Sequence, residues 1–308
     1  MVLLALPGAC AIYYSTIQPE WLLMLTTAIF IAAAGLAIYA LPFRAGIAVW
    51  AAIVFGVLLW YIQDPPSNNR DWATEYAIPA TVSHNGQTIT IHNIRNFTYR
   101  SETDMTPHYY DAAFRLDDLD TVDLVSSYWS GDAIAHIFLT FGFRDGRHLA
   151  ISIETRRQKR FPYSTIAGFF HHFELFYVVA DERDLIGVRT DIRHERVYLY
   201  RLQIAPAARQ ALFLSYVNQI DQLSKHPEWY NTLTDNCTTG ILARAAAAPD
   251  VKYNWHVVLS GYAPAYAYKR GLLNTGLSFP ELKQKSLIVR PPGARITGSY
   301  SQDIRKNL

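Results

Sequence analysis

Two long apolar runs near the start of the chain predict a membrane hairpin. Residues 21–43 and 45–63 contain no charged side chain. Each run is long enough to cross a hydrocarbon core about 30 Å thick as a helix. Only Arg44 separates them, so the link between the two spans is very short. Residues 2–16 are also apolar, and they predict a shorter third span. We therefore expect residues 1–63 to form an anchor of two or three transmembrane helices.

After residue 63 the pattern changes to short alternating runs with turn signals between them. Residues 64–80 begin with the polar stretch DPPSNNRD, which predicts a linker. In the run 81–91, Asn85-Gly86 lies between β-rich flanks and predicts a hairpin with a type I′ turn.

A second hairpin is predicted by two β-branched and aromatic runs, 133–143 and 147–157, which flank an Asp-Gly pair. Further strands are predicted at 121–129, 177–186 and 195–202. Helices are expected from Pro206, from near Cys237 to Pro249, and around 256–272. Apolar residues follow Pro206 at helical spacing: Leu212, Phe213, Tyr216, Val217, Ile220 and Leu223. This mix predicts an α+β domain over 81–290, followed by a C-terminal tail at 291–308.

Charge is balanced over the chain and concentrated beyond the anchor. The 28 basic and 26 acidic side chains give a net charge of +2. Such a balance does not indicate a nucleic-acid-binding protein, which usually carries a basic patch. Residues 1–63 hold one acid, Glu20, and one base, Arg44. If Arg44 stays in the cytoplasm, the second span delivers residues 64–308 to the outside.

Cys237 is the only cysteine after Cys10, so it has no partner for a disulfide within the outer domain. It is either an inert buried thiol or a reactive one. Asp235 and Asn236 are residue types that cap helices, which places the thiol in the first turn of a helix. There the helix dipole favours the thiolate and lowers the thiol pKa. This position favours Cys237 as a nucleophile, and nearby backbone N–H groups as binders of an oxyanion.

A thiolate nucleophile needs a base, and alternation in the 133–157 hairpin selects one of the ten histidines. If residues 144–146 form a three-residue loop, the numbers of paired residues sum to 290. His136 then lies opposite Glu154 on the same face, where a carboxylate would orient the imidazole. The alternative is an ordinary half-buried histidine in the sheet. The sequence contains no HExxH or cysteine-rich spacing, so we expect neither a metal nor a cofactor.

Several of these motifs, in this order, resemble the Lnb N-terminal periplasmic domain family. They are SHNGQTITIHNIRNFTYRSETD, DLVSSYWSGDAIAHIFLTFGF, LAISIETRR, VVADERDLI, VYLY and WYNTLTDNCTT, spread over roughly residues 65–290. The resemblance implies a circularly permuted papain-like fold with an antiparallel sheet, akin to the NlpC-type and lecithin:retinol-acyltransferase-type enzymes. It also implies that Cys237 is the nucleophile, that His136 is the base and that Glu154 is the orienting residue.

The family's named member is linked to N-acylation of bacterial lipoproteins. The resemblance therefore implies an inner-membrane protein whose periplasmic domain moves an acyl chain from a membrane phospholipid to a lipoprotein amine. Phe169, Phe170 and Trp255 are candidates to line an acyl groove, although ordinary core positions suit each of them. Two alternatives stay open: a cysteine amidase or peptidase that acts on cell-wall peptides, and a non-catalytic membrane-anchored scaffold. The sequence does not indicate the oligomeric state.

Overall fold

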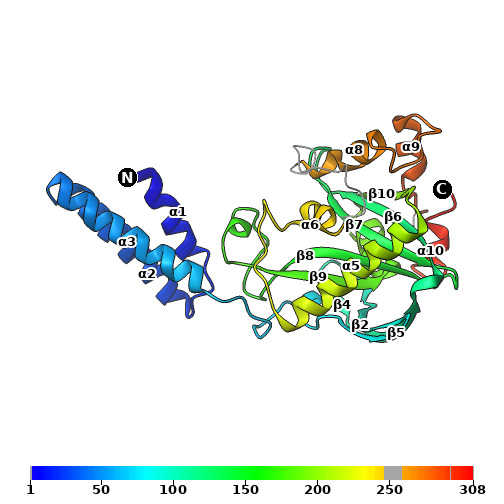
Figure 1. Cartoon of the computed structure of the whole chain (residues 1–308), viewed down its shortest axis with the longest axis horizontal. Coiled ribbons are helices and arrows are strands. Elements are labelled where there is room, and N and C mark those ends of the chain that lie inside the picture. Colours follow the sequence, from blue (N-terminus) through cyan, green and yellow to red (C-terminus); the bar gives the residue numbers. More distant parts are fainter. Residues whose placement is uncertain (1, 246–258, 292, 308) are drawn as a thin grey trace. The chain divides into compact units, whose positions relative to one another are not determined.

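The computed structural model describes residues 2–245, 259–291 and 293–307 of the chain (Figure 1). The chain forms two compact units, and neither is continuous in sequence. The anchor unit combines Met1–Asp71, Thr155–Leu175 and Pro227–Thr232. The sheet unit combines Trp72–Glu154, Phe176–His226 and Leu233–Leu308.

Three helices form the first part of the anchor unit: α1 (Val2–Tyr13), α2 (Glu20–Tyr39) and α3 (Phe43–Gln63). Both α2 and α3 are long and apolar enough to cross a membrane, with a mean hydropathy of 2.2 in each. Phe43 and Ile62 of α3 are 74% and 68% exposed. A helix of a soluble domain would bury such side chains against a core, so this surface suits lipid. At 1.5 Å per residue the 12-residue α1 is about 18 Å long, shorter than a hydrocarbon core.

The later segments of the anchor unit pack on the ends of these helices. His171 is stacked between the rings of Tyr61 and Trp229, with centroid distances of 3.8 Å and 4.7 Å. Trp229 Nε1 donates a hydrogen bond to the carbonyl oxygen of Asp64 at 3.1 Å. The ring of Phe170 stacks on Tyr14 at the end of α1. Residues far apart in the sequence therefore complete the anchor unit.

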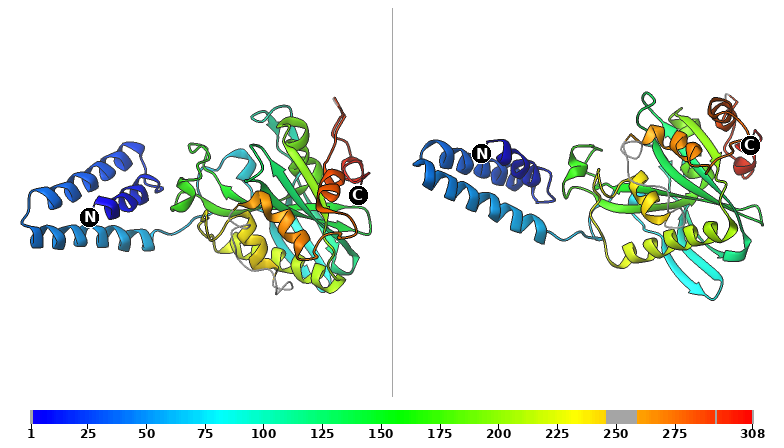
Figure 2. Two further views of the ribbon diagram at one scale, coloured as in Figure 1. Left: turned by 90° about the horizontal axis from the view of Figure 1, so that it is seen from above. Right: turned by 45° about the horizontal axis from the view of Figure 1, so that its top comes forward.

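The sheet has eight strands, most of them in the sheet unit, in the order β1-β2-β9-β8-β7-β6-β10, with β5 also paired to β2. Figure 2 shows the ribbon from two further sides. The strands are β1 (Thr81–Asn85), β2 (Thr88–Arg95), β5 (Tyr109–Arg115), β6 (Leu119–Tyr128), β7 (His136–Phe143), β8 (His148–Arg156), β9 (Glu174–Asp181) and β10 (Arg196–Arg201). A separate two-stranded sheet consists of β3 (Thr98–Tyr99) and β4 (Met105–Thr106).

Both predicted hairpins are present, β1-β2 and β7-β8. The prediction of a type I′ turn at Asn85-Gly86 is wrong. Asn85 pairs with Thr88, so the two-residue loop is Gly86-Gln87. A type I′ turn needs a positive φ at both loop residues, but of the two only Gly86 has one, at 60°.

The α+β class is confirmed, but the prediction of an antiparallel sheet is wrong because the sheet is mixed. Strands β2 and β9 run parallel, with Arg95 paired to Ala180. Hairpin signals report only on strands that are neighbours in the sequence. A parallel pair needs a long crossover between its strands, and local turn residues do not signal one.

One face of the sheet is covered by α5 (Pro206–Lys225) (Figure 1). The helix starts at Pro206 and buries the predicted stripe of apolar residues, which confirms this element. Phe141 of β7 packs against Phe213 and Tyr216 of α5, with ring centroids 5.1 Å and 5.6 Å apart. Residue 138, an odd number of positions from 141, points to the opposite face of the sheet.

On that opposite face Phe138 joins a core cluster with Leu185, Ile186, Tyr300 and Ile304. The remaining α-helices among the described residues are α4 (Glu182–Leu185), α6 (Cys237–Arg244), α8 (Ala263–Lys269), α9 (Phe279–Ser286) and α10 (Tyr300–Asp303). Short helical turns are η1 (Thr74–Tyr76), η2 (Leu116–Asp118), η3 (Ala167–Phe169), η4 (Val188–Ile192) and η5 (Ser260–Tyr262). The predicted helix end at Pro249, and part of the helix expected around 256–272, lie outside the described residues.

Candidate active site

Cys237 is the first residue of α6, as the capping residues predicted. The side-chain oxygen of Asn236 accepts hydrogen bonds from the backbone N–H groups of Thr238 and Thr239, each at 2.9 Å. In return, the hydroxyl of Thr239 accepts a hydrogen bond from the backbone N–H of Asn236 at 2.8 Å. This reciprocal capping box fixes the start of the helix and therefore the position of the thiol.

Gly240 lets α6 lie close to the sheet. A Cβ atom at this position would be 2.5 Å from Cδ1 of Ile153 on β8. That separation is shorter than real contacts allow, so a larger residue would have to displace either the Ile153 side chain or the helix. The small residue one turn after Cys237 therefore helps to set the distance from the thiol to β7 and β8.

The predicted register brings His136 and Glu154 together. The described β7-β8 pairs run from Leu139↔Ile151 to Gly142↔His148, and the residue numbers of each pair sum to 290. His136 Nε2 lies 3.0 Å from Glu154 Oε1, and both side chains are 16% exposed.

Ser152, on the same face of β8, connects these two side chains. Its hydroxyl lies 2.6 Å from His136 Nε2 and donates to Glu154 Oε1 at 2.8 Å. The Nε2 side of the imidazole is thus held by Ser152 and Glu154. The imidazole of His136 and the thiol of Cys237 are close enough for each to shift the pKa of the other.

The charges of the three groups support one another. Burial opposes a charged imidazole, but the charge of Glu154 and hydrogen bonds with Cys237 and Glu154 raise the pKa of His136 to about 9. Burial also opposes the charge of Glu154, yet His136, Arg189 and Ser152 hold the pKa of this carboxyl well below its usual range.

The same balance acts on the thiol. Burial raises the pKa of Cys237, but His136, the backbone N–H of Ile137 and the hydroxyl of Thr238 outweigh it and leave the pKa below its ordinary value. The arrangement favours a thiolate beside an imidazolium, which is the state that a cysteine nucleophile needs.

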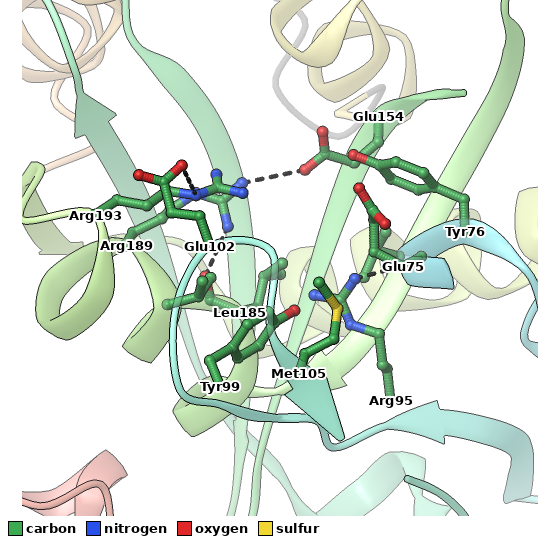
Figure 3. A pocket seen from close by; sticks show the side chains of 12 residues that line it. Glu75, Tyr76, Arg95, Tyr99, Glu102, Met105, Glu154, Leu185, Arg189 and Arg193 are labelled. Atoms are coloured by element: carbon green, nitrogen blue, oxygen red, sulfur yellow. Dashed lines mark hydrogen bonds and ion pairs between the residues drawn. The ribbon is translucent and has the colours of Figure 1, made fainter. Parts of the chain in front are cut away.

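Arg189 also belongs to this site, and sequence reasoning missed it. Its Nη2 donates to Glu154 Oε1 at 3.2 Å, and its Nη1 donates to the carbonyl oxygen of Leu185 at 2.7 Å (Figure 3). Its guanidinium carbon lies 5.1 Å from the centre of the Phe138 ring. Arg189 is in the π-helical turn η4, 35 residues after Glu154, and no local motif marks it.

A small polar cavity lies on the Arg189 side of Glu154. Its volume is about 60 Å³, and its lining includes Arg95, Arg189, Arg193, Glu75, Glu102 and Tyr99 (Figure 3). Pockets for small molecules usually measure roughly 300–1,000 Å³, so this one is too small for an acyl chain. It has room for a few water molecules, which would solvate the charged groups behind Glu154.

Phe169 and Phe170 belong to the anchor unit, whereas Cys237, His136 and Glu154 belong to the sheet unit. Trp255 lies outside the described residues. Among the residues that the structure describes, no group of three or more His, Cys, Asp and Glu side chains is placed to hold a metal ion.

A family model described as the Lnb N-terminal periplasmic domain matches residues 105–267, which is more than half of the chain. The matched range includes Cys237, His136, Glu154 and Arg189. No curated protein and no solved structure matches the chain.

Proposed function

The chain belongs to the Lnb N-terminal periplasmic domain family, and on that premise we propose that it is a thiol acyltransferase with Cys237 as the nucleophile. The family and the two apolar helices together indicate a membrane-anchored protein with a periplasmic domain. The proposed membrane is the inner membrane, the acyl donor is a phospholipid and the acceptor is the amine of a lipoprotein.

The observation that carries this proposal is the chain of contacts from Cys237 through His136 to Glu154. The thiolate attacks the carbonyl carbon of the phospholipid ester and forms a tetrahedral intermediate. As that intermediate collapses, the C–O bond breaks and the imidazolium of His136 gives its proton to the departing alcohol oxygen. The products of this step are a lysophospholipid and an acyl-thioester on Cys237.

In the second half of the reaction, the acceptor amine attacks the thioester carbonyl. Neutral His136 takes a proton from the amine, the C–S bond breaks and the thiolate returns. Glu154 keeps His136 oriented through both halves and stabilises its charged form. Ser152 and Arg189 hold Glu154 in turn, so the proton carrier keeps one position throughout.

We also propose that the sheet unit is a permuted papain-like domain. The support is its order of parts, since the histidine strand β7 precedes the cysteine helix α6 in sequence. The thiol at a helix start, with a histidine on a neighbouring strand, is the arrangement that papain-like chemistry uses.

The test is to trap the acyl-enzyme. Full-length protein in detergent would be mixed with a phospholipid that carries an isotope-labelled acyl chain, and its mass measured intact and after digestion. We expect a hydroxylamine-sensitive acyl adduct on the Cys237 peptide and release of lysophospholipid. Cys237→Ala should show neither. Protein that consumes no lipid and gains no adduct, yet cleaves peptidoglycan fragments, would overturn acyl transfer in favour of the amidase alternative.

A further inference from the structure

The segment from Lys159 to Phe170, here named the 159–170 loop, exposes three large apolar side chains. Tyr163 is 57% exposed, Ile166 is 59% exposed and Phe169 is 38% exposed. They recur at every third position, with Ser164 and Thr165 between the first two and the small residues Ala167 and Gly168 between the last two. Exposed apolar clusters on a protein surface commonly mark a contact with a membrane or another protein.

Hydrogen bonds on the inner side of the loop keep these apolar side chains exposed. The backbone N–H of Thr232 donates to the carbonyl of Gly168 at 2.8 Å, and the hydroxyl of Thr232 donates to the carbonyl of Thr165 at 3.1 Å. A Cβ atom on Gly168 would lie 2.4 Å from that hydroxyl oxygen. Gly168 and Ala167 are buried, and the turn they form is locked on its inner side, with Ile166 and Phe169 left outside.

Contacts within the anchor unit place the loop beside the end of α1, and His171, which follows the loop, stacks on Tyr61 near the end of α3. Arg160 Nη2 donates to the carbonyl of Thr16, three residues past the end of α1, at 3.4 Å. His172 Nδ1 lies 2.9 Å from the carbonyl oxygen of Tyr14. Membrane helices end at the level of the lipid headgroups, where tyrosine and tryptophan are common. Because His171 follows the loop and stacks on Tyr61 near the end of α3, we expect the loop to lie at that level.

The basic side chains of the loop suit a position among lipid headgroups. Arg160 is exposed and precedes the apolar positions, as does Lys159, whose ammonium also pairs with Asp71 at 2.7 Å. The guanidinium carbon of Arg160 lies 4.1 Å from the centre of the Phe161 ring, so the cation stays beside an aromatic group. Basic side chains next to exposed apolar ones suit a surface of anionic lipid headgroups.

We propose that the 159–170 loop is a membrane-contact loop, whose Tyr163, Ile166 and Phe169 enter the headgroup region of the bilayer that holds α2 and α3. The contact is independent of Cys237. It adds an interfacial attachment to the transmembrane one, in the same compact unit of the protein.

The test measures the surroundings of a fluorescent label at the loop. In full-length protein with Cys10→Ser and Cys237→Ser, Ile166→Cys would carry an environment-sensitive dye. The matched control is Val289→Cys, since Val289 is an exposed aliphatic residue of the sheet unit. Both proteins would be placed in nanodiscs of phosphatidylethanolamine and phosphatidylglycerol, with and without a lipid that carries a quencher just below its headgroup.

We expect a blue-shifted emission and loss of most of the fluorescence to the lipid quencher at position 166. A second variant, Ile166→Asp with Phe169→Asp and the dye at Tyr163→Cys, should lose the lipid quenching. A dye at 166 that a water-soluble quencher reaches as well as it reaches 289 would overturn the proposal. So would shielding of 166 from both quenchers, which would indicate a protein partner.

Discussion

The anchor unit and the sheet unit each place a histidine beside a carboxylate, and the two pairs behave in opposite ways. In the sheet unit His136 Nε2 lies 3.0 Å from Glu154, and the pKa of His136 is raised to about 9. In the anchor unit His171 Nδ1 lies 3.9 Å from Asp64, and the pKa of His171 is lowered to about 4.

The difference comes from hydrogen bonds and from the charge of the partner. Among the described residues, neither His171 Nδ1 nor the nearer oxygen of Asp64 has a hydrogen-bond partner. Burial raises the pKa of the Asp64 carboxyl, which works against the negative charge that would attract a proton to His171. The imidazole of His171 is buried between the rings of Tyr61 and Trp229, and this burial lowers its pKa. Proximity to a carboxylate alone therefore does not make a histidine a base.

The largest expected effect is the removal of the base. His136→Gln should lower the acylation rate by about 10²–10⁴-fold, the usual contribution of a general acid–base group. It should also move the midpoint of Cys237 alkylation by iodoacetamide to higher pH, because the imidazolium that stabilises the thiolate is gone. His171→Gln is the control, and it should leave this midpoint unchanged. An equal shift in both variants would contradict the assignment of His136.

A smaller effect is expected from neutralising each carboxylate. Glu154→Gln should bring the pKa of His136 down from about 9 toward the ordinary value near 6.5. Asp64→Asn should hardly change the pKa of His171, because burial sets that value. NMR titration of histidines labelled in both variants measures the two shifts. A large shift at His171 would show that the two pairs are alike after all.

Arg189 is expected to act on catalysis through Glu154 and not by itself. Arg189→Gln should lower kcat by roughly tenfold, an effect of about 1.4 kcal/mol on the barrier, and move the alkaline limb of the pH–rate profile to higher pH, because a positive charge near the imidazolium of His136 is lost. Arg189→Lys should restore part of both, because it keeps a positive charge near Glu154 Oε1 but loses the planar two-sided contact. Loss of folding alone would lower the rate of both variants without moving that limb.

The smallest effect concerns stability at the two ends of the pH range. The raised pKa of His136 contributes stability that is present below pH 6.5 and is lost as the pH rises through about 9. The lowered pKa of His171 has the opposite sign, so its contribution is present above pH 6.5 and is lost as the pH falls through about 4.

His171→Phe keeps the aromatic stack but cannot take up a proton. Its thermal midpoint should exceed that of the unmodified protein by roughly 2–4 °C at pH 4.5 and match it at pH 7.5. Differential scanning fluorimetry in detergent measures this, and a gain of equal size at both pH values would contradict the sign.

Local signals in the sequence paired His136 with Glu154 and placed Cys237 at a helix start, whereas the pairing of Cys237 with His136 followed from the family resemblance. The capping residues placed the thiol, and loop length with alternation fixed which residues of β7 and β8 face each other. The parallel pairing of β2 with β9 and the contact of Arg189 with Glu154 join residues many positions apart. Such contacts depend on how whole elements pack against one another. The periodicity of residues within one element does not predict that packing.

The division of the anchor unit among three stretches of sequence has a consequence for its synthesis. The hydrogen bond from Trp229 to Asp64 joins residues 165 positions apart. At a translation rate of about 5–20 residues per second, Trp229 leaves the ribosome roughly 10–30 s after Asp64. During that interval the end of α3 is not covered by Trp229. A chain cut before residue 227 would stay in that unfinished state, and a soluble fragment that starts at Asp64 would present Phe170, His171 and Trp229 without Tyr14 and Tyr61.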